Sequence, residues 1–471
     1  MPFVARNPTT GELLDSLPSL DANAREALLG RTHARQQQWR YCTIEERAPF
    51  IRALGSALTR HREALAHALT REMGKPIGAA RAEVDKCASL CVQAPDLARE
   101  ALLPETLVED SVAIVTLRYD ALGTILAIMP WNFPYWQALR FAIPALLAGN
   151  GVLVKPAPSV PGSARLLQQC IDEARRDAAS AGAPDAPCDI ALFEHEVLDS
   201  VIADPRIVGV TLTGSDRAGR HVAQVAGAHL KKVVLELGGS DPFIVLPDAD
   251  IDRAAAVAVS ARTVNSGQSC VAAKRFIVCD DIYDAFLERF VAGMRALVVG
   301  DPADERTQVG PIATSPVRDG LAAQVRRSIE RGARALVGGD AAGLPGYFYP
   351  PTVLVDIPDD APAAREELFG PVASVFRVRD IDHAITRAND SPFGLGASVW
   401  TQNDAWAERC IARLDAGMIF INDMVVSDPR YPFGGVKQSG VGRELGPIGF
   451  REFTNLKSVN YRKSRDISRH L

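Results

Sequence analysis

The chain has 471 residues, and its 52 basic and 57 acidic side chains leave a formal net charge of −5 at pH 7. At roughly 100–200 residues per domain, this length predicts about two to four domains whose cores need no disulfide or metal. The mildly acidic balance excludes a dedicated nucleic-acid or anionic-membrane binder, and no apolar stretch is long enough to span a bilayer.

The cysteines and the N-terminal residues indicate the compartment. Eight cysteines are too sparse for a disulfide scaffold, and none is paired at the spacing of a metal site. The N-terminal residues reach acidic and turn residues without forming an apolar core, which argues against a secretion signal. We therefore expect a cytoplasmic protein without a metal site.

The first half of the chain predicts helices, followed by alternating strands and helices. Residues 20–103 are rich in Ala, Leu, Arg and Glu with apolar positions at helical spacing, which indicates several amphipathic helices. Beyond them we expect strands at 112–118, 123–129, 151–155, 190–193 and 208–211, helices at 164–179 and 216–228, and a surface loop at 178–187. This alternation is typical of an α/β fold with a parallel sheet wrapped by helices.

The pattern restarts after a strand-like segment at 233–237. It predicts a second α/β unit that begins near Gly238, with strands at 243–246 and 275–278 and helices at 251–263 and 282–297. Residues 455–471 have strand character and a basic end, so this tail could pair with another subunit or could fray.

Cys270 closes the segment N-S-G-Q-S-C, in which small and polar residues follow a helical stretch. A thiol in such a turn could be a nucleophile if its thiolate is stabilised, whereas most cytosolic cysteines are inert buried residues. Glu236 lies between leucines at the end of the strand-like segment V-V-L-E-L-G-G. A carboxylate buried there must be ion-paired or have a raised pKa, so a structural and a general-base role are both open.

Further polar groups follow other predicted strands. Asn132 lies in P-W-N-F-P, where its amide could donate to an oxyanion or simply form a turn. Lys155 ends a strand in L-V-K-P-A-P, and Gly214 and Ser215 precede a helix whose N-terminus could bind phosphate or merely be capped. The G-x-G-x-x-G dinucleotide fingerprint is absent.

Together and in this order, these segments resemble the NAD(P)-dependent aldehyde dehydrogenase superfamily. The resemblance covers nearly the whole chain and rests on seven motifs: P-W-N-F-P, K-P-A, T-G-S, E-L-G-G, G-Q-S-C, E-E-L-F-G-P at 366–371 and P-F-G-G-V-K-Q-S-G-x-G-R-E at 432–444. It implies an aldehyde-dehydrogenase-like α/β fold with a Rossmann-like cofactor domain, an α/β catalytic domain and a small β oligomerisation unit.

The resemblance also implies a division of the chain. We expect a cofactor-binding domain at 1–105 and 123–231, a catalytic domain at 232–454, and oligomerisation strands at 106–122 and 455–471. Because members of the family are dimers or tetramers, a homo-oligomer is expected here.

The resemblance assigns a role to each matching residue. Cys270 would be the nucleophile, Glu236 the general base that activates water, and Asn132 the oxyanion donor beside the Cys270 backbone N–H. NAD or NADP would be held by Lys155 at the adenosine ribose, Gly214 and Ser215 at the pyrophosphate, Glu367 at the nicotinamide ribose, and Trp131, Leu237 and Phe369 close by. Since relatives that transfer the acyl group to coenzyme A typically lack this glutamate, hydrolysis to a free acid is expected.

Three stretches around these motifs resemble the succinate-semialdehyde dehydrogenase branch most closely. In that branch an arginine and a serine reach the far carboxylate of the substrate, and Arg140 and Ser427 stand at the matching positions. A salt bridge is the alternative role of Arg140. Some members have a second arginine six residues before the nucleophile, where this chain has Val264, and Arg262 is out of register. Succinate semialdehyde is the expected substrate; glutarate semialdehyde or a simple aliphatic or aromatic aldehyde is the alternative.

Two departures from the family pattern bear on the cofactor and on redox control. Pro158 stands where strict NAD members have a glutamate that binds the ribose 2′-hydroxyl, so we expect NADP to be accepted. Ala272 stands where some members have a second cysteine that forms a switch disulfide, so no such switch is expected. The rival interpretations are a catalytically silent protein that keeps the fold and a cofactor-free thiol hydrolase.

Overall fold

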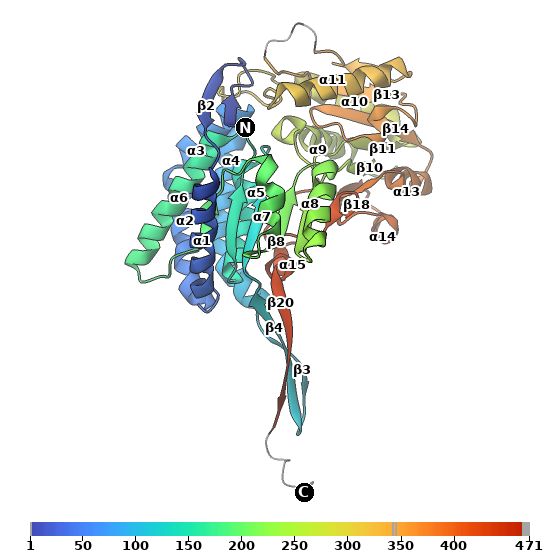
Figure 1. Ribbon diagram of the computed structural model, residues 1–471. Helices are drawn as coiled ribbons and strands as arrows, with labels where there is room; N and C mark the ends of the chain where they lie inside the picture. Colours follow the sequence, from blue (N-terminus) through green and yellow to red (C-terminus); the bar gives the residue numbers. More distant parts are fainter. Residues whose placement is uncertain (1, 342, 344–345, 464–471) are drawn as a thin grey trace.

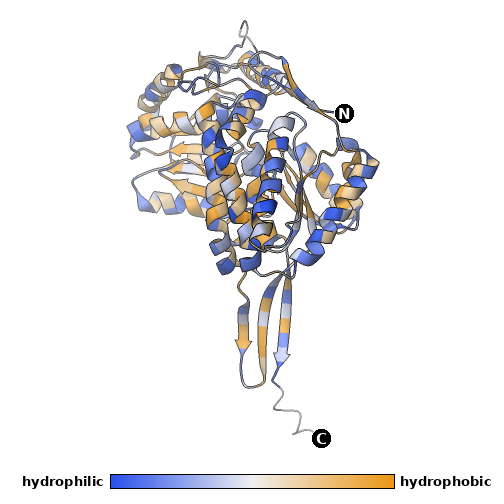
Figure 2. Ribbon diagram, turned by 90° about the vertical axis from the view of Figure 1, so that its left-hand side faces the viewer, coloured by the Kyte–Doolittle hydropathy of each residue, from blue (hydrophilic) through white to orange (hydrophobic). Residues whose placement is uncertain are grey.

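The computed structural model describes residues 2–341, 343 and 346–463, and its body consists of two open sheets surrounded by helices. A three-stranded sheet projects from this body as a long arm (Figure 1). Figure 2 shows mainly hydrophobic strands inside the body and helices that carry many hydrophilic residues around them. This is the layered α/β architecture that the alternation of strands and helices predicts.

The first sheet has six strands in the order β19-β9-β8-β5-β6-β7, and its short edge strand β19 runs antiparallel to β9. The strands are β5 (Thr124–Ile128), β6 (Gly151–Lys155), β7 (Cys188–Ile190), β8 (Ile207–Thr213), β9 (Lys232–Glu236) and β19 (Gly440–Val441). β5 and β6 are buried along their whole length, which explains why both are almost entirely apolar instead of alternating.

Helices from both ends of the chain pack around this sheet. They are α1 (Ala22–Trp39), α2 (Ile44–Arg60), α3 (Arg62–Met73), α4 (Ile77–Ala101), α5 (Pro134–Leu147), α6 (Pro161–Ser180), the 3₁₀ turn η1 (His195–Val197), α7 (Leu198–Ala203), α8 (Asp216–Ala228) and α15 (Gly446–Glu452). The first four confirm the amphipathic helices expected at 20–103, because their apolar positions, such as Leu54 and Leu58, are buried in one core with α5 and α6.

The second sheet has seven strands in the order β12-β13-β14-β11-β10-β16-β17, with β12 as its antiparallel edge. The strands are β10 (Pro242–Val245), β11 (Arg275–Cys279), β12 (Arg334–Val337), β13 (Thr352–Val355), β14 (Val372–Val378), β16 (Gly396–Trp400) and β17 (Met418–Ile421). The helices of this half are α9 (Ile251–Thr263), the 3₁₀ turn η2 (Val264–Gly267), α10 (Asp280–Ala296), α11 (Ser315–Glu330), α12 (Pro362–Arg365), α13 (Ile381–Asn389) and α14 (Asp404–Arg413).

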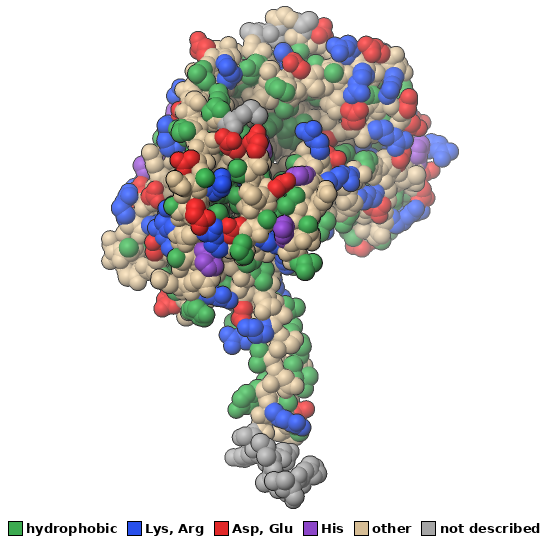
Figure 3. All heavy atoms as spheres, viewed as in Figure 1, with side chains coloured by type: hydrophobic (Ala, Val, Ile, Leu, Met, Phe, Trp, Pro, Cys, Tyr) green, Lys and Arg blue, Asp and Glu red, His purple; other side chains and the backbone are tan. Residues whose placement is uncertain are grey.

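The remaining strands form two small ladders and the arm. The small ladders pair β1 (Phe3–Arg6) with β2 (Leu13–Leu17) and β15 (Phe393–Gly394) with β18 (Val436–Lys437). The arm consists of β3 (Glu105–Glu109), β4 (Ala113–Ala121) and β20 (Thr454–Arg462), with β4 in the middle. Its strands carry exposed apolar side chains, including Leu107, Leu456 and Tyr461, and Figure 3 shows hydrophobic atoms along its surface.

Some predicted boundaries differ from the structure. The strand expected at 190–193 ends earlier, because residues 191–193 form a tight turn in which the Phe193 N–H donates to the Ala191 carbonyl at 2.8 Å. The strand expected at 112–118 continues to Ala121, since β20 pairs with it along its whole length. α6 continues to Ser180, so the loop expected at 178–187 is shorter. Residues 464–471 of the predicted strand tail lie outside the described residues.

The two sheets do not divide at the predicted domain boundary between residues 231 and 232. β9 begins at Lys232, yet it pairs in parallel with β8 and so belongs to the first sheet. β19 and α15 also return to the first half of the molecule. The division into three domains stays a prediction, and the segment 237–241 links the sheets.

The described residues contain neither a membrane-spanning helix nor a metal-binding cluster. Their helices include none with the length and apolar character needed to cross a bilayer. Within residues 2–341, 343 and 346–463, no group of three or more His, Cys, Asp or Glu side chains is arranged to hold a metal ion.

Candidate active site

Four of the predicted site residues lie at the carboxyl edge of the first sheet. Asn132 follows β5, Lys155 ends β6, Gly214 follows β8 and Glu236 ends β9. Parallel strands place their carboxyl ends on one edge of a sheet, so segments that are far apart in the sequence meet there. Ligands of open α/β sheets bind at this edge.

A pocket of about 300 Å³ opens at this edge. It is lined by Pro130, Trp131, Asn132, Thr213, Gly214, Ser215, Leu237, Gly238, Cys270, Val317, Glu367 and Phe369. All of the residues predicted to act in catalysis or cofactor binding, except Glu236 and Lys155, therefore lie on one cavity. The Trp131 and Phe369 rings meet edge to face there, with centroids 5.8 Å apart.

Cys270 follows a loop with unusual backbone geometry. Asn265 and Ser266 have left-handed φ values of 54° and 56°, and Gly267 continues the turn at 77°. Such conformations cost free energy in non-glycine residues and persist only where their surroundings hold them. The Ser266 hydroxyl accepts from the Gly310 N–H at 2.9 Å, and the buried Arg262 guanidinium donates to the Gly267 carbonyl at 2.8 Å. These two hydrogen bonds therefore fix the conformation of the loop that precedes Cys270.

The Asn132 turn is tied directly to this loop. The Asn132 side-chain amide donates to the Gln268 carbonyl at 3.1 Å, and the Asn265 amide donates to the Asn132 carbonyl at 2.8 Å. An amide nitrogen carries two hydrogens, so Asn132 keeps a second one for another acceptor. Asn132 and Cys270 line the same pocket, which is the arrangement an oxyanion site requires.

The other side of the Asn132 turn is held by two residues that the sequence analysis missed. The buried Glu83 carboxylate accepts from the backbone N–H groups of Tyr135 and Trp136, each at 3.0 Å, and so caps α5. Lys75 pairs with Glu83, and its ammonium lies 3.9 Å from the centroid of the Phe133 ring. Both residues belong to the helical region 20–103, where the pattern gave no sign that they would reach the site.

The charges around Cys270 act in opposite directions. Burial raises the pKa of the Cys270 thiol to about 11, while Arg140 and then Lys274 lower it. The Lys274 ammonium donates to the Cys270 carbonyl at 2.7 Å and pairs with Glu367 at 3.1 Å. The thiol is therefore mostly protonated at neutral pH in the ligand-free protein, and the two cations favour the thiolate once it forms.

Glu236 is buried behind the pocket at the end of β9. Among the described residues, neither of its carboxylate oxygens has a hydrogen-bond partner. Burial raises the pKa of Glu236 well above its usual range, the nearby Glu444 raises it further, and Arg140 and Arg443 oppose the shift. This environment favours the neutral form of Glu236 more than an exposed position would, and a carboxylate with a raised pKa is a stronger base once it is deprotonated.

Arg140 lies on α5 and is almost completely buried. Its Nε donates to the Glu444 carboxylate in a buried ion pair, and its guanidinium lies 4.3 Å from the centroid of the Phe433 ring. Its Nη2 atom is buried and has no partner among the described residues. Arg140 thus has the salt bridge that was the alternative to substrate binding, and it also retains a free donor.

Replacing Arg140 alone should change the stability of the protein mainly through loss of its ion pair with Glu444. Arg140→Met leaves the Glu444 carboxylate buried and uncompensated, which we expect to lower the free energy of unfolding by about 3–5 kcal/mol. The double variant Arg140→Met/Glu444→Gln should recover most of this loss. Urea unfolding of the three proteins measures both effects, and equal destabilisation of the single and double variants would show that the pair is not the cause.

Ser427 and Lys155 lie outside the 300 Å³ pocket. The Ser427 hydroxyl accepts from the Trp136 indole N–H at 3.2 Å. Trp136 precedes Arg140 by one turn of α5. The buried Lys155 ammonium lies 5.7 Å from the centroid of the Phe3 ring, and burial lowers the pKa of Lys155 to about 8. The roles of Ser427 and Lys155 at the substrate carboxylate and the adenosine ribose stay predictions.

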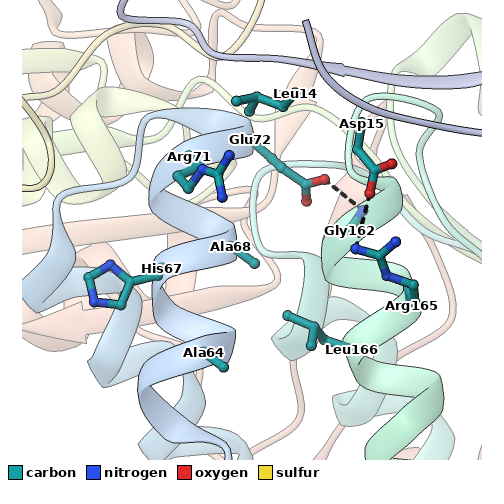
Figure 4. Close-up of a pocket in the computed structure, with 10 residues that line it drawn as sticks. All are labelled: Leu14, Asp15, Ala64, His67, Ala68, Arg71, Glu72, Gly162, Arg165 and Leu166. Atoms are coloured by element: carbon teal, nitrogen blue, oxygen red, sulfur yellow. Dashed lines mark hydrogen bonds and ion pairs between the residues drawn. The ribbon is translucent and has the colours of Figure 1, made fainter.

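A separate pocket of about 230 Å³ lies between α3 and α6 (Figure 4). Glu72 points from α3 to the first turn of α6, where it accepts from the backbone N–H groups of Gly162 at 2.6 Å and Ser163 at 2.8 Å. Asp15 pairs with Arg165 at 3.1 Å. The carboxylates of this pocket therefore serve the packing of α6, and none of the predicted site residues lines it.

The chain belongs to the aldehyde dehydrogenase family, whose sequence profile matches residues 2–459. It is 46% identical over 98% of its length to succinate-semialdehyde dehydrogenase [NADP(+)] 1 of Mycobacterium ulcerans, and covers 99% of that protein. It is 47% identical to succinate semialdehyde dehydrogenase [NAD(P)+] Sad of Escherichia coli, over 97% of both chains. Among solved structures, succinic semialdehyde dehydrogenase from Streptococcus pyogenes in complex with NADP+ is similar with a TM-score of 0.93 and 36% identity, covering 98% of this chain and 100% of that one. The expected family and α/β fold are thus confirmed.

Proposed function

We propose that the protein oxidises succinate semialdehyde to succinate with NADP or NAD, through a thiohemiacetal and a thioester on Cys270. The observation that carries the substrate is Arg140: it is close enough to lower the pKa of Cys270, and its buried Nη2 is an unused donor. A guanidinium is well suited to a carboxylate because its donors form a planar fork. The names of the relatives support the same aldehyde.

The residues of the pocket account for the chemical steps. The Cys270 thiolate adds to the aldehyde carbon, and the resulting alkoxide accepts hydrogen bonds from the Asn132 amide and the Cys270 backbone N–H. A bound NAD or NADP would supply the acceptor for the hydride that leaves this carbon. Glu236 then takes a proton from water, which attacks the thioester. The C–S bond breaks, the carboxylic acid is released, and the Cys270 thiolate is restored.

The pocket suits a dinucleotide. Thr213 Oγ1 is buried on its wall without a partner among the described residues, and the N-terminus of α8 opens there through Gly214 and Ser215. Such helix ends bind phosphate through free backbone N–H groups. Lys155 and Glu367 would hold the two riboses, and Trp131, Leu237 and Phe369 would form apolar contacts around the cofactor.

Pro158 favours acceptance of NADP, because no carboxylate stands there to repel a 2′-phosphate. We expect Pro158→Glu to lower kcat/KM for NADP by about tenfold or more, with a smaller effect on NAD, since like charges brought together cost about 1.4 kcal/mol or more. The test is to measure both cofactors at one saturating aldehyde concentration. Parallel changes for both cofactors would mean that residue 158 does not face the 2′ position.

An aldehyde panel tests the proposed function. Succinate semialdehyde and butanal have the same number of carbons and differ in the terminal carboxylate, so their kcat/KM ratio isolates its recognition. We expect a ratio of at least about ten, the effect of one charge-assisted hydrogen bond. Equal or better turnover of butanal would overturn the substrate, and a preference for glutarate semialdehyde would replace it. Ester hydrolysis without cofactor, together with no aldehyde oxidation when NAD or NADP is present, would favour the thiol hydrolase.

We also infer a homo-oligomer, in which the arm of β3, β4 and β20 pairs with another subunit. The exposed apolar side chains of the arm and its two open strand edges support this role. All eight cysteines are free thiols, which agrees with a proposed location in the reducing cytoplasm. Light scattering that returned the monomer mass would contradict the assembly.

A further inference from the structure

Lys86 lies on α4 and contacts Ser427, one of the two residues expected to bind the substrate carboxylate. Its ammonium donates to the backbone carbonyl of Ser427 and lies 4.1 Å from the centroid of the Trp136 ring. The Trp136 indole N–H in turn donates to the Ser427 hydroxyl at 3.2 Å. Lys86, Trp136 and Ser427 therefore form one contact cluster, with residues from α4, α5 and the segment after β17.

Arg140 faces this cluster. It follows Trp136 by four residues on α5, so both side chains lie on one face of the helix. After burial, the charge of Arg140 is the largest influence that lowers the pKa of Lys86, which falls to about 8. The charge of Arg140, which is buried and paired with Glu444, is thus felt at the half-buried Lys86.

The carboxylates near Lys86 are engaged elsewhere. The neighbouring Cys87 and the carboxylates of Asp428 and Glu83 raise the pKa of Lys86, but Asp428 pairs with Arg430 at 2.8 Å, and Glu83 pairs with Lys75. In the described part of the chain, no carboxylate forms an ion pair with Lys86. An ammonium has three donors, and the Ser427 carbonyl uses one while the Trp136 ring covers another side. The cluster therefore retains positive charge and a free donor.

We propose that Lys86 binds the far carboxylate of the substrate together with Arg140 and Ser427, and so determines the preference for aldehydes that carry an ω-carboxylate. This inference rests on the proposed oxidation of succinate semialdehyde. Lys86 would supply, from α4, the second cation that some relatives place at the position of Val264. A carboxylate bound between Lys86 and Arg140 would be attracted by both charges, whereas the uncharged end of a simple aldehyde would not.

A charge-removing variant with a matched charge-keeping variant tests the proposal. We expect Lys86→Met to lower the ratio of kcat/KM for succinate semialdehyde to kcat/KM for butanal by about 10- to 100-fold, mainly through KM. Lys86→Arg should restore most of the ratio, because it keeps the charge. The exposed Lys232, which pairs with Glu452 at the start of β9, gives the control Lys232→Met, which should leave the ratio unchanged.

The pH dependence of the wild-type enzyme is a second, independent measurement. Since the Lys86 ammonium loses its proton above about pH 8, the same ratio should fall as the pH rises from 7 to 9. Taking a ratio cancels the titration of Cys270 and Glu236, which act on both aldehydes. In Lys86→Arg the ratio should stay level, because the guanidinium remains charged.

The outcomes separate this inference from the proposed function. If the wild-type enzyme does not prefer succinate semialdehyde over butanal, the proposed function fails. If it does, but Lys86→Met keeps the preference or lowers both activities equally, the Lys86 assignment alone is overturned. If Lys86→Met does not fold, two other results would each overturn the Lys86 assignment. One is a ratio that stays level between pH 7 and 9 in the wild-type enzyme, and the other is loss of the preference for succinate semialdehyde in Lys86→Arg.

Discussion

Cys270→Ala is expected to abolish aldehyde oxidation, with kcat lowered by at least about 10⁴-fold. The thiol forms the covalent bond on which both later steps depend, and no other cysteine lines the 300 Å³ pocket in the described residues. The measurement is the absorbance of reduced cofactor at saturating aldehyde. Cys42→Ala is the matched control, since Cys42 lies at the end of α1, is partly exposed, and should be dispensable.

Binding of NADP to the Cys270→Ala variant, followed by quenching of protein fluorescence, should persist because the cofactor contacts remain. Activity that survived the substitution would overturn the mechanism. Loss of both binding and activity would instead indicate a damaged fold. A related expectation concerns the thiol itself: since the pKa of Cys270 is about 11, alkylation of the ligand-free enzyme by iodoacetamide should accelerate steadily between pH 7 and 10.

Glu236→Gln is expected to separate the two halves of the reaction. Hydride transfer does not require Glu236, so one equivalent of reduced cofactor per site should form rapidly. Steady-state turnover should then fall by about 10²- to 10⁴-fold, because the thioester lacks its general base. Stopped-flow absorbance measures both phases. The amide matches the shape of the protonated carboxyl group that the raised pKa of Glu236 favours, so the fold should be preserved.

The pH profile sharpens this test. In the wild-type enzyme the deacylation rate should rise as the pH passes through the raised pKa of Glu236, because only its deprotonated form can take a proton from water. The Glu236→Gln variant should lack this rise. Glu452→Gln is the control, because Glu452 also influences the pKa of Glu236 but is paired with Lys232. In this variant we expect steady-state turnover to continue, with no initial burst of reduced cofactor. A Glu236→Gln enzyme with normal turnover would assign water activation to another group.

The sequence predicted the parts of this protein that depend on local pattern. Apolar periodicity indicated the helices at 20–103, and apolar runs indicated the buried strands, because both patterns record which faces lie away from water. The motifs that follow β5, β6, β8 and β9 could be assigned together, since parallel strands bring their carboxyl ends to one edge. Most of the residues chosen in this way line one pocket.

Contacts between distant segments could not be predicted in the same way. The membership of β9 in the first sheet is decided by its pairing with β8, which hydropathy does not encode. Arg140 and Glu444 are 304 positions apart, so no spacing could identify their ion pair or show that it complicates the substitution of Arg140. Lys86 belongs to a helix that served only as scaffold in the sequence pattern.

Short motifs and periodicity were therefore enough to assign the family and the α/β fold and to single out Cys270 as the predicted nucleophile, because that information is carried locally. Which charged groups influence one another became visible only in three dimensions: Glu444 acts on the buried Glu236, and Arg140 acts on the half-buried Lys86. The physical reason is that burial and the Coulomb interaction depend on distance in space, and the packing of α4 and α5 against the C-terminal segments sets those distances.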